Sequence, residues 1–442
     1  MILIFLLIAA PLAFACRHNV TILVLSILCA VNFYFTVIAA NAKIPRNLFI
    51  IPGLIFIAVA CLQLARGMFV YPWGTVIFDL IKFISYALVF LAVITRLGGP
   101  QGRASTPTTR RSIQNILRLG CLSGCLSIFF HSIYDFNSHM FANALYFTVL
   151  LALASGPGSR GEEYDRVFFK RITDTIIWTG LSVAVFAIVQ KFSYNGHIFW
   201  IGIEAPCPVG PYYNYDHFAG FMELCTPLAI ASAIANIDRA SFSSRKGWAQ
   251  KVLWFSTSEA NQTLRYIFFA MIMAATIFMS TSRGGIMSFC ITQVIFLAII
   301  LFKSAHRKRG QKIGFLLGTM VLLVTIFVIW LGPEEFLERF RLTSIEKIVK
   351  MEGPDATRLM FYRDTITMIK KGPALGTGLG TFGAAFAPYR KFNDDDLGFL
   401  RYTHNDYLQL MAEMGPWAGG GIIFIYLILF GREYLLCTRR LE

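Results

Sequence analysis

The stretch "HNDYLQLMAEMGPWAGGGIIFIYLILF" at residues 404–430 joins a polar helix start to an apolar run long enough to cross a bilayer. Gly415-Pro416 lies between the two parts, and this pair predicts a break in the helix. Comparable apolar runs recur along the whole chain, separated by short basic stretches. The pattern is typical of an all-α polytopic membrane protein.

The composition agrees with that class. Of the 442 residues, 56% are hydrophobic and 15% are charged, so one soluble core could not bury the apolar surface. The first run lacks a basic start and a clear cleavage site, and we interpret it as a retained span rather than a signal peptide. We expect about twelve transmembrane helices. They are predicted near residues 2–16, 19–40, 48–64, 75–95, 113–131, 140–156, 173–190, 218–237, 266–282, 284–302, 313–331 and 404–430.

Lysine and arginine are concentrated in alternate loops, as in "RKRGQK" at residues 307–312. By the positive-inside rule these loops are cytoplasmic, which places both termini in the cytoplasm. We interpret the net charge of +15 as this topology signal rather than as a nucleic-acid surface. The nine cysteines show no disulfide framework, because nearly all lie in or beside apolar runs.

Four regions are predicted. An N-terminal transmembrane region covers 1–160, with a two-span hairpin at 113–156, and a second transmembrane region covers 161–331. A long loop with helical patterns covers 332–403 on the non-cytoplasmic side, and the final helix and cytoplasmic tail cover 404–442. A connection of about seventy residues is unusually long, and we expect it to be functional.

The motif "TSRGG" (281–285) lies at a predicted outer hairpin. An arginine at the end of a span commonly extends to the lipid headgroups. The guanidinium of Arg283 could equally grip a phosphate, because the following glycines let backbones approach closely. Arg358, Arg363 and Arg401 add positive charge in the long loop, where a solvated surface is the competing explanation. Together these arginines predict an anion site on the outer face.

His404 is the strongest candidate for a catalytic base. Thr403 and Asp406 fit a helix-start capping pattern, which would put His404 at the first helical position. The helix dipole there favours a neutral imidazole, and a neutral imidazole can accept a proton. Capping alone would also explain Asp406. With Gln409 and Glu413 it forms a polar stripe that enters the membrane, where polar groups are functional or tightly paired.

The loop "PVGPYYNYDHFAGF" (208–221) offers further candidate ligands for sugars. Tyr213 and its aromatic neighbours Tyr212 and Phe218 could stack on sugar rings, and an interfacial aromatic belt would explain them too. Asn214 and His217 could bind sugar hydroxyls or form a polar turn. The candidate substrate-binding residues also include Asn405, Asp406, Gln409 and Glu413.

"NDDD" (393–396) contains the Asp394-x-Asp396 spacing that can hold a magnesium or manganese ion. An acidic, solvated loop tip is the simpler explanation, and we expect no metal site.

Four motifs in order resemble the O-antigen ligase family and its relatives, the Wzy-type polysaccharide polymerases. They are "GPYYNYDHFAGFMEL" (210–224), "TSRGG", "RLMFYRDTITMIKKGPALGTGLGTF" (358–382) and "HNDYLQLMAEMG" (404–415), and the likeness covers roughly 165–430. Each motif alone is weak, but the four together are fairly specific.

The resemblance implies a membrane glycosyltransferase with a C-type-like helical fold. Such enzymes take a glycan from an undecaprenyl-diphosphate carrier at the periplasmic face of the bacterial inner membrane. They pass it to lipid A–core or to another glycan, and catalysis is metal-independent. Arg283 matches a family arginine that holds the diphosphate, and His404 matches the family's outer histidine. The motifs do not separate ligase from polymerase.

Two features depart from the family pattern. No arginine lies between Lys191 and Arg239, although the family often has one just before the loop glycine near Gly210. The segment "FFHSIYDFNSHMFANALYF" (129–147) looks like one that many relatives carry near the C-terminus. We expect this early hairpin to leave the topology after it unchanged.

A transporter of lipids or lipid-linked glycans is the alternative, since polar helix ends and cationic grips serve transporters too. A transporter would show matching halves with ionisable residues near the midplane. The sequence has no clear internal repeat, and its chemistry gathers at one face, which favours glycan transfer.

Overall fold

The computed structural model describes residues 1–13, 19–66, 73–97, 108–156, 163–200, 209–237, 258–303, 354–391 and 402–439, with scattered positions between 314 and 329. Over these residues the regular structure is helical, apart from one isolated bridge between Val209 and Tyr212. The expected all-α class is therefore confirmed.

Eight helices in the described ranges are long and apolar enough to cross a membrane, so a multi-pass protein is confirmed. The predicted span near 313–331 lies almost wholly outside the described residues, and the total of twelve stays a prediction. Three shorter apolar helices are α1 (Ile2–Leu12), α3 (Ile50–Ala65) and α6 (Phe141–Ser155). The eight long ones are α2 (Asn19–Phe33, continued to Ile38 by a π-helix), α4 (Trp73–Leu97), α5 (Thr108–His131), α7 (Glu163–Ser193), α8 (Tyr215–Ile237), α10 (Ser258–Met279), α11 (Arg283–Lys303) and α18 (Pro416–Arg439).

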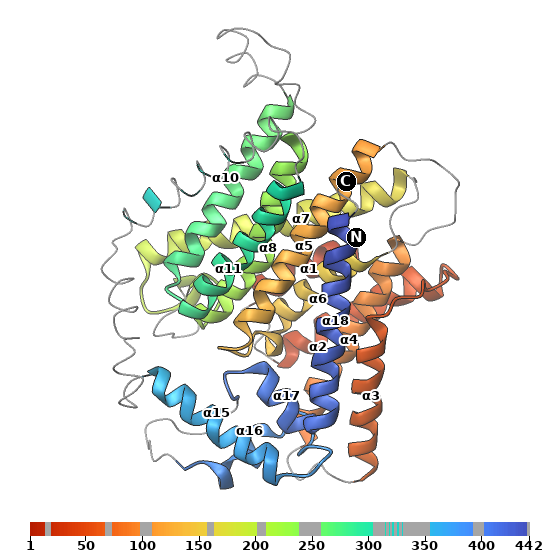
Figure 1. The fold of residues 1–442 in the computed structure, drawn as a ribbon, viewed down its shortest axis with the longest axis vertical. Coiled ribbons are helices and arrows are strands. Elements are labelled where there is room, and N and C mark those ends of the chain that lie inside the picture. The colour runs from red at the N-terminus through yellow and green to blue at the C-terminus, as the bar shows by residue number, and fades with distance from the viewer. Residues whose placement is uncertain are drawn as a thin grey trace.

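Helix α8 lies at the centre of the bundle, and α5 and α10 pack against it most closely (Figure 1). Gly120 and Gly124 of α5 make this packing possible. A Cβ on Gly120 would lie 2.4 Å from Cβ of Ala231, and one on Gly124 would lie 2.9 Å from the Leu224 carbonyl oxygen. Small residues one turn apart let two membrane helices approach closely, so α8 is buried along its whole length.

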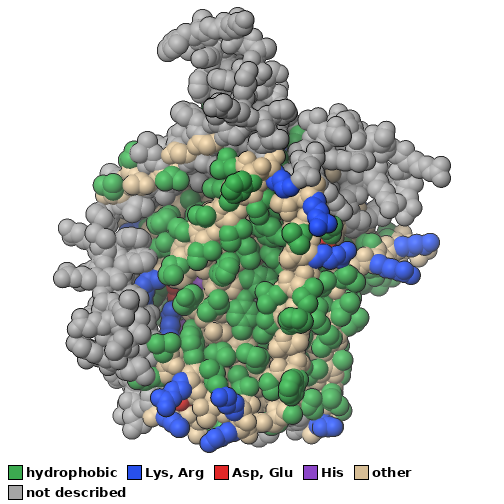
Figure 2. Space-filling view, viewed as in Figure 1, with side chains coloured by type: hydrophobic (Ala, Val, Ile, Leu, Met, Phe, Trp, Pro, Cys, Tyr) green, Lys and Arg blue, Asp and Glu red, His purple; other side chains and the backbone are tan. Residues whose placement is uncertain are grey.

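Hydrophobic side chains cover much of the visible outer surface between basic side chains near its two ends (Figure 2). Large apolar residues such as Phe302 and Val294 of α11 are mostly exposed. An exposed apolar belt of this kind is stable in contact with lipid chains rather than with water.

Three further helices gather at one end of the bundle, away from the C-terminus (Figure 1). They are α15 (Pro354–Lys371), α16 (Phe382–Phe386) and α17 (Asp406–Met414), so the part of the long loop that is described is partly helical, as expected. The predicted break is also confirmed. Helix α17 ends at Met414, Gly415 has a φ of 87°, and α18 begins at Pro416.

The glycine-rich turn between α15 and α16 packs closely against the end of α17. A Cβ on Gly376, whose φ is 75°, would lie 2.3 Å from the Glu413 carbonyl oxygen. The Glu413 carboxylate accepts hydrogen bonds from the backbone N–H groups of Gly380 (2.9 Å) and Phe382 (3.2 Å). Gln63 of α3 donates to the carbonyl oxygens of Leu375 (2.6 Å) and Glu413 (2.8 Å). Glu413, expected to bind substrate, is therefore tightly paired within the protein.

Replacing Gly376 by alanine should destabilise the protein by about 3 kcal/mol, because the new Cβ would collide with backbone and the positive φ would be strained. Gly421→Ala is the matched control, because a Cβ there meets nothing within 4 Å. Thermal unfolding in detergent micelles measures the difference. Equal melting temperatures for the two variants would contradict the close crossing of the turn and α17.

Candidate functional site

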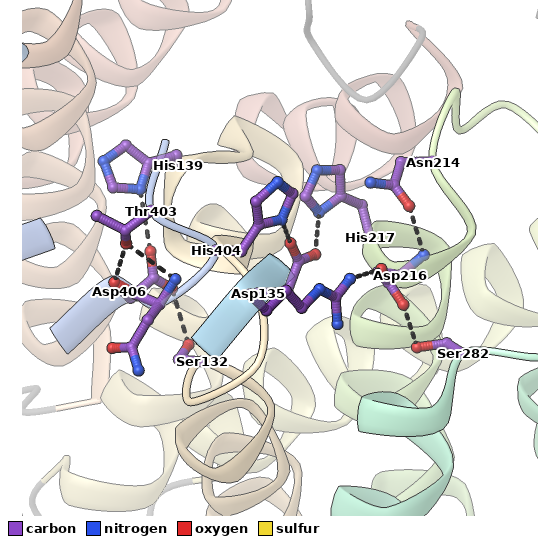
Figure 3. Close-up of polar contacts among 12 residues, drawn as sticks. Ser132, Asp135, His139, Asn214, Asp216, His217, Ser282, Thr403, His404 and Asp406 are labelled. Atoms are coloured by element: carbon purple, nitrogen blue, oxygen red, sulfur yellow. Dashed lines mark hydrogen bonds and ion pairs between the residues drawn. The ribbon is translucent and has the colours of Figure 1, made fainter. Parts of the chain in front are cut away.

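Asp135 lies in the turn after α5 and is fully buried. Its Oδ1 is 3.1 Å from Nδ1 of His404, and its Oδ2 is 3.1 Å from Nδ1 of His217 (Figure 3). His217 comes from the first turn of α8, and His404 precedes α17. One carboxylate thus joins three distant parts of the chain.

This contact determines which nitrogen of the His404 ring donates to Asp135. An ionised carboxylate only accepts hydrogen bonds, so Nδ1 of His404 carries the proton and donates it to Asp135. When the ring is neutral, its Nε2 atom then has a free lone pair. The ring is held from other sides as well. Phe136 lies edge-on to it at 5.0 Å, and Tyr362 donates to the His404 carbonyl oxygen at 2.8 Å.

The charge of Asp135 is stabilised by its two partners. Burial alone would raise the pKa of this carboxyl, but the charges and hydrogen bonds of His217 and His404 outweigh burial and hold its pKa well below the ordinary value. Asp135 is therefore a carboxylate at neutral pH. It can orient His404 and stabilise the imidazolium that forms when Nε2 takes a proton.

Asp216, beside His217, is a second carboxylate that joins distant parts of the chain, and we call these contacts the junction at Asp216. Its Oδ1 accepts from Oγ of Ser282 at 2.5 Å, and its Oδ2 pairs with a guanidinium nitrogen of Arg358 at 3.3 Å. Burial alone would lower the pKa of Arg358, but the charges of Asp216 and Asp135 raise it. Asn214 accepts from the backbone N–H of Asp216 at 2.8 Å, so it forms the polar turn that begins α8.

The "TSRGG" motif starts α11 at this junction. Ser282 accepts from the Gly285 N–H at 3.1 Å and so caps the helix, while its own hydroxyl donates to Asp216. A Cβ on Gly285 would lie 2.6 Å from Cβ of Ala219, so only glycine lets α11 approach α8 this closely. Arg283 opens the helix directly after Ser282 and is half-buried.

A buried pair lies against the same glycines. Nδ1 of His131 is 2.8 Å from Oε1 of Glu223, and both side chains are inaccessible to solvent. The position of a Cβ on Gly284 is 3.2 Å from the His131 ring, and that on Gly285 is 3.0 Å from Glu223. This pair therefore packs against the first turn of α11 and helps to hold it in place.

A fourth histidine–carboxylate pair joins His139 to Asp406, 3.0 Å apart (Figure 3). Asp406 also accepts from Oγ of Ser132 at 2.8 Å, and its backbone N–H donates to the Ser132 carbonyl oxygen. Gln409 lies between His139 and Glu413, 3.2 Å from each. The predicted polar stripe is thus a chain of internal hydrogen bonds.

The predicted start of the last polar helix is wrong by two residues. Asn405, not Thr403, is the N-cap, with its side chain accepting from the Leu408 N–H at 2.9 Å. The side chain of Asp406 does not cap the helix, because its two carboxylate oxygens pair with Ser132 and His139. His404 lies before the helix with a φ of 54°, so Asp135 rather than the start of a helix orients its ring.

The structure does not bring all of the other predicted site residues together. Tyr213 and Arg363 are exposed, whereas Tyr212 and Phe218 are fully buried core residues and cannot stack on sugars. Arg401, Asp394 and Asp396 lie outside the described residues. Within the part of the chain that is described, no group of three or more histidine, cysteine, aspartate or glutamate side chains is arranged to hold a metal.

Sequence reasoning missed the residues from the segment 129–147. Asp135, Ser132 and His139 all come from it, although it was expected only to leave the later topology unchanged. The available signal was its density of polar groups, with two histidines, an aspartate and two asparagines between apolar runs. Polar groups at membrane depth are functional or paired, and here they lie against the motifs at 281–285 and 404–415.

The stability of the fold should depend on pH through His139. Burial alone would lower its pKa, but the hydrogen bond and charge of Asp406 raise it above the ordinary value. The stabilisation is therefore complete below about pH 6.5 and is lost as pH rises through the raised folded pKa.

The advantage in melting temperature of the wild type over His139→Gln should therefore shrink as the pH rises above about 6.5, measured across a pH series in one detergent. A constant or growing difference would contradict this.

Residues 268–425 match the family model described as O-antigen ligase. No curated protein matched the chain. No solved structure matched it either. The matched region contains Arg283, Arg358 and His404, and it agrees with the family resemblance of the sequence motifs. Over residues 268–425 the chain is therefore similar to the O-antigen ligase family, and this similarity points to a role in glycan transfer.

Proposed function

We propose that this protein transfers a glycan from an undecaprenyl-diphosphate carrier to an acceptor hydroxyl at the periplasmic face of the bacterial inner membrane. The observation that carries the proposal is the contact between Nδ1 of His404 and Asp135, which leaves Nε2 free to accept a proton. A base with this arrangement activates a hydroxyl nucleophile.

The reaction is substitution at an anomeric carbon. Nε2 of His404 takes the proton of the acceptor hydroxyl as its oxygen attacks that carbon. The bond from the carbon to the carrier diphosphate breaks, and the diphosphate leaves with the electron pair. Asp135 offsets the positive charge that appears on the imidazole, as a carboxylate does in other histidine-based sites.

The leaving diphosphate needs cationic partners. Arg358 pairs directly with Asp216, and Arg283 directly follows Ser282, whose hydroxyl donates to the same carboxylate. Guanidinium groups bind diphosphate oxygens in pairs and stabilise the charge that develops there. We infer that Arg358 leaves Asp216, at least in part, for the donor. Arg401 stays a further candidate for the same role.

The acceptor is lipid A–core for a ligase, or a growing glycan for a polymerase. The end of the bundle that carries α15 to α17 then faces the periplasm, and both termini face the cytoplasm. This orientation agrees with the basic loops of the sequence.

His404→Gln should lower the initial rate of transfer by about 10²–10⁴-fold, because glutamine cannot take the proton. Asp135→Asn should lower it by about 10²-fold or more, because the ring loses its orienting carboxylate. The assay supplies undecaprenyl-diphosphate-linked glycan with or without lipid A–core to protein in nanodiscs, with products read by mass spectrometry. His197→Gln is the control, since this histidine lies in the turn after α7.

The products distinguish the candidate reactions. Glycan on the core identifies a ligase, and longer carrier-linked chains without core identify a polymerase. If nothing is transferred to any acceptor while labelled carrier still moves between leaflets, the proposal of an enzyme is overturned and a transporter is favoured. Full activity of His404→Gln would overturn its role as the base.

Arg358→Ala should lower kcat/KM for the same transfer by about 10²–10³-fold, since one cation at the diphosphate is lost. Arg363→Ala, an exposed arginine on the same helix, should change it by less than about threefold. Equal losses for the two variants would contradict the assignment of the diphosphate to the junction at Asp216.

A further inference from the structure

Helix α15 presents two polar side chains to the site from one of its faces. Arg358 and Tyr362 are four residues apart in this helix, so they lie one turn apart on the same face. Arg358 pairs with Asp216 at 3.3 Å, and the Tyr362 hydroxyl lies 2.8 Å from the His404 carbonyl oxygen. One helix therefore contacts both the junction at Asp216 and the segment that carries the proposed base.

The Tyr362 hydroxyl also bridges the two segments that meet at Asp135. It lies 3.0 Å from the carbonyl oxygen of Ile133, in the turn that carries Asp135, and 2.8 Å from that of His404. The side-chain amide of Asn405 donates to the same Ile133 carbonyl at 3.0 Å. A hydroxyl has one proton, so Tyr362 donates to one of the two carbonyls at a time. Either bond ties α15 to the backbone beside the contact between Asp135 and His404.

His404 needs such support because its backbone is strained. Its φ of 54° lies in the left-handed region, which a residue other than glycine keeps only where surrounding contacts hold it. The carbonyl group that Tyr362 contacts belongs to this residue. If the backbone relaxed, the ring would rotate away from Asp135, and a displacement of about 1 Å is enough to lower a catalytic rate by about 10²-fold.

We propose that Tyr362 is a positioning residue for His404, and that α15 couples the donor diphosphate to the base. The helix that supplies Arg358 to the diphosphate also supplies the hydroxyl that holds the His404 backbone. A donor bound to Arg358 therefore fixes α15 in the position from which Tyr362 aligns His404. Tyr362 acts through a carbonyl group and takes no part in the proton transfer. This inference rests on the proposed glycan transfer and deepens it.

Tyr362→Phe tests the positioning, because it removes the hydroxyl and keeps the ring. In the nanodisc transfer assay, kcat at saturating donor and acceptor should fall about tenfold, since His404 is aligned in a smaller fraction of the complexes. KM for the donor should change by less than about twofold, because Arg358 is intact. A purely structural role would lower the melting temperature without this selective loss of kcat.

Tyr407→Phe is the matched control. The Tyr407 hydroxyl also donates to a backbone carbonyl oxygen, that of Phe129, at 2.6 Å, and this bond joins α17 to α5. Its loss should lower the melting temperature by a similar amount and change kcat by less than about twofold. Melting temperatures in one detergent show that both variants fold.

A double-mutant cycle tests the coupling through α15. Arg358→Ala, Tyr362→Phe and the double variant are compared with the wild type in kcat/KM for the donor. If α15 links the two sites, removing the hydroxyl costs less in the Arg358→Ala background, because the donor no longer fixes the helix there. The combined loss should then be smaller than the product of the single losses by about threefold or more.

The outcomes separate this inference from the proposed function. Full kcat in folded Tyr362→Phe, beside an active wild type, would overturn the positioning role. Equal losses of kcat in Tyr362→Phe and Tyr407→Phe would also overturn it, because any hydroxyl bond between helices would then serve. Single losses that multiply in the double variant would overturn the coupling through α15. A wild type that transfers no glycan would overturn the proposed function itself, and this inference with it.

Discussion

The arrangement of the site depends on one buried carboxylate that two histidines share. Asp135 pairs with His217 and with His404, which lies 269 residues away in the chain. A charge of this kind is stable only with partners, and removing one partner of a buried pair costs about 3–5 kcal/mol. The contact therefore fixes the turn after α5, the start of α8 and the segment before α17 relative to one another. The left-handed backbone of His404 persists because these contacts hold its ring and its carbonyl group.

Close backbone approaches make that contact possible. Gly220 of α8 lies against Asn137, where a Cβ would be 2.4 Å from the amide oxygen. Gly285 lies against Ala219 and Glu223 in the same way. Because these glycines have no side chain, Asn137 can lie against α8 and Glu223 can lie against α11. In "TSRGG" the arginine is the apparent functional residue, yet the serine and glycines determine where it is placed, through a cap, a bond to Asp216 and tight packing.

The sequence predicted the features that depend on local patterns. Apolar runs gave the positions of the long helices, and Gly415-Pro416 gave the break between α17 and α18. The N-cap was mispredicted because Thr403 and Asn405 are both good caps locally, and tertiary bonds from Ser132 and His139 decide the role of Asp406. The pairing of Asp135 with His404 could not be predicted from one sequence, because no local sequence pattern indicates a contact between residues so far apart in the chain.

The polar residues at the start of α17 serve two different purposes. His404 points its ring to Asp135 and to the arginine side of the site, whereas Asp406, Gln409 and Glu413 continue inward as a hydrogen-bonded chain. That chain holds the glycine-rich turn through Glu413, so it fixes the position of α16 against the membrane bundle. Under the proposed function, a donor diphosphate is attracted to Arg358 at Asp216, which favours an approach to His404 from the arginine side of the site.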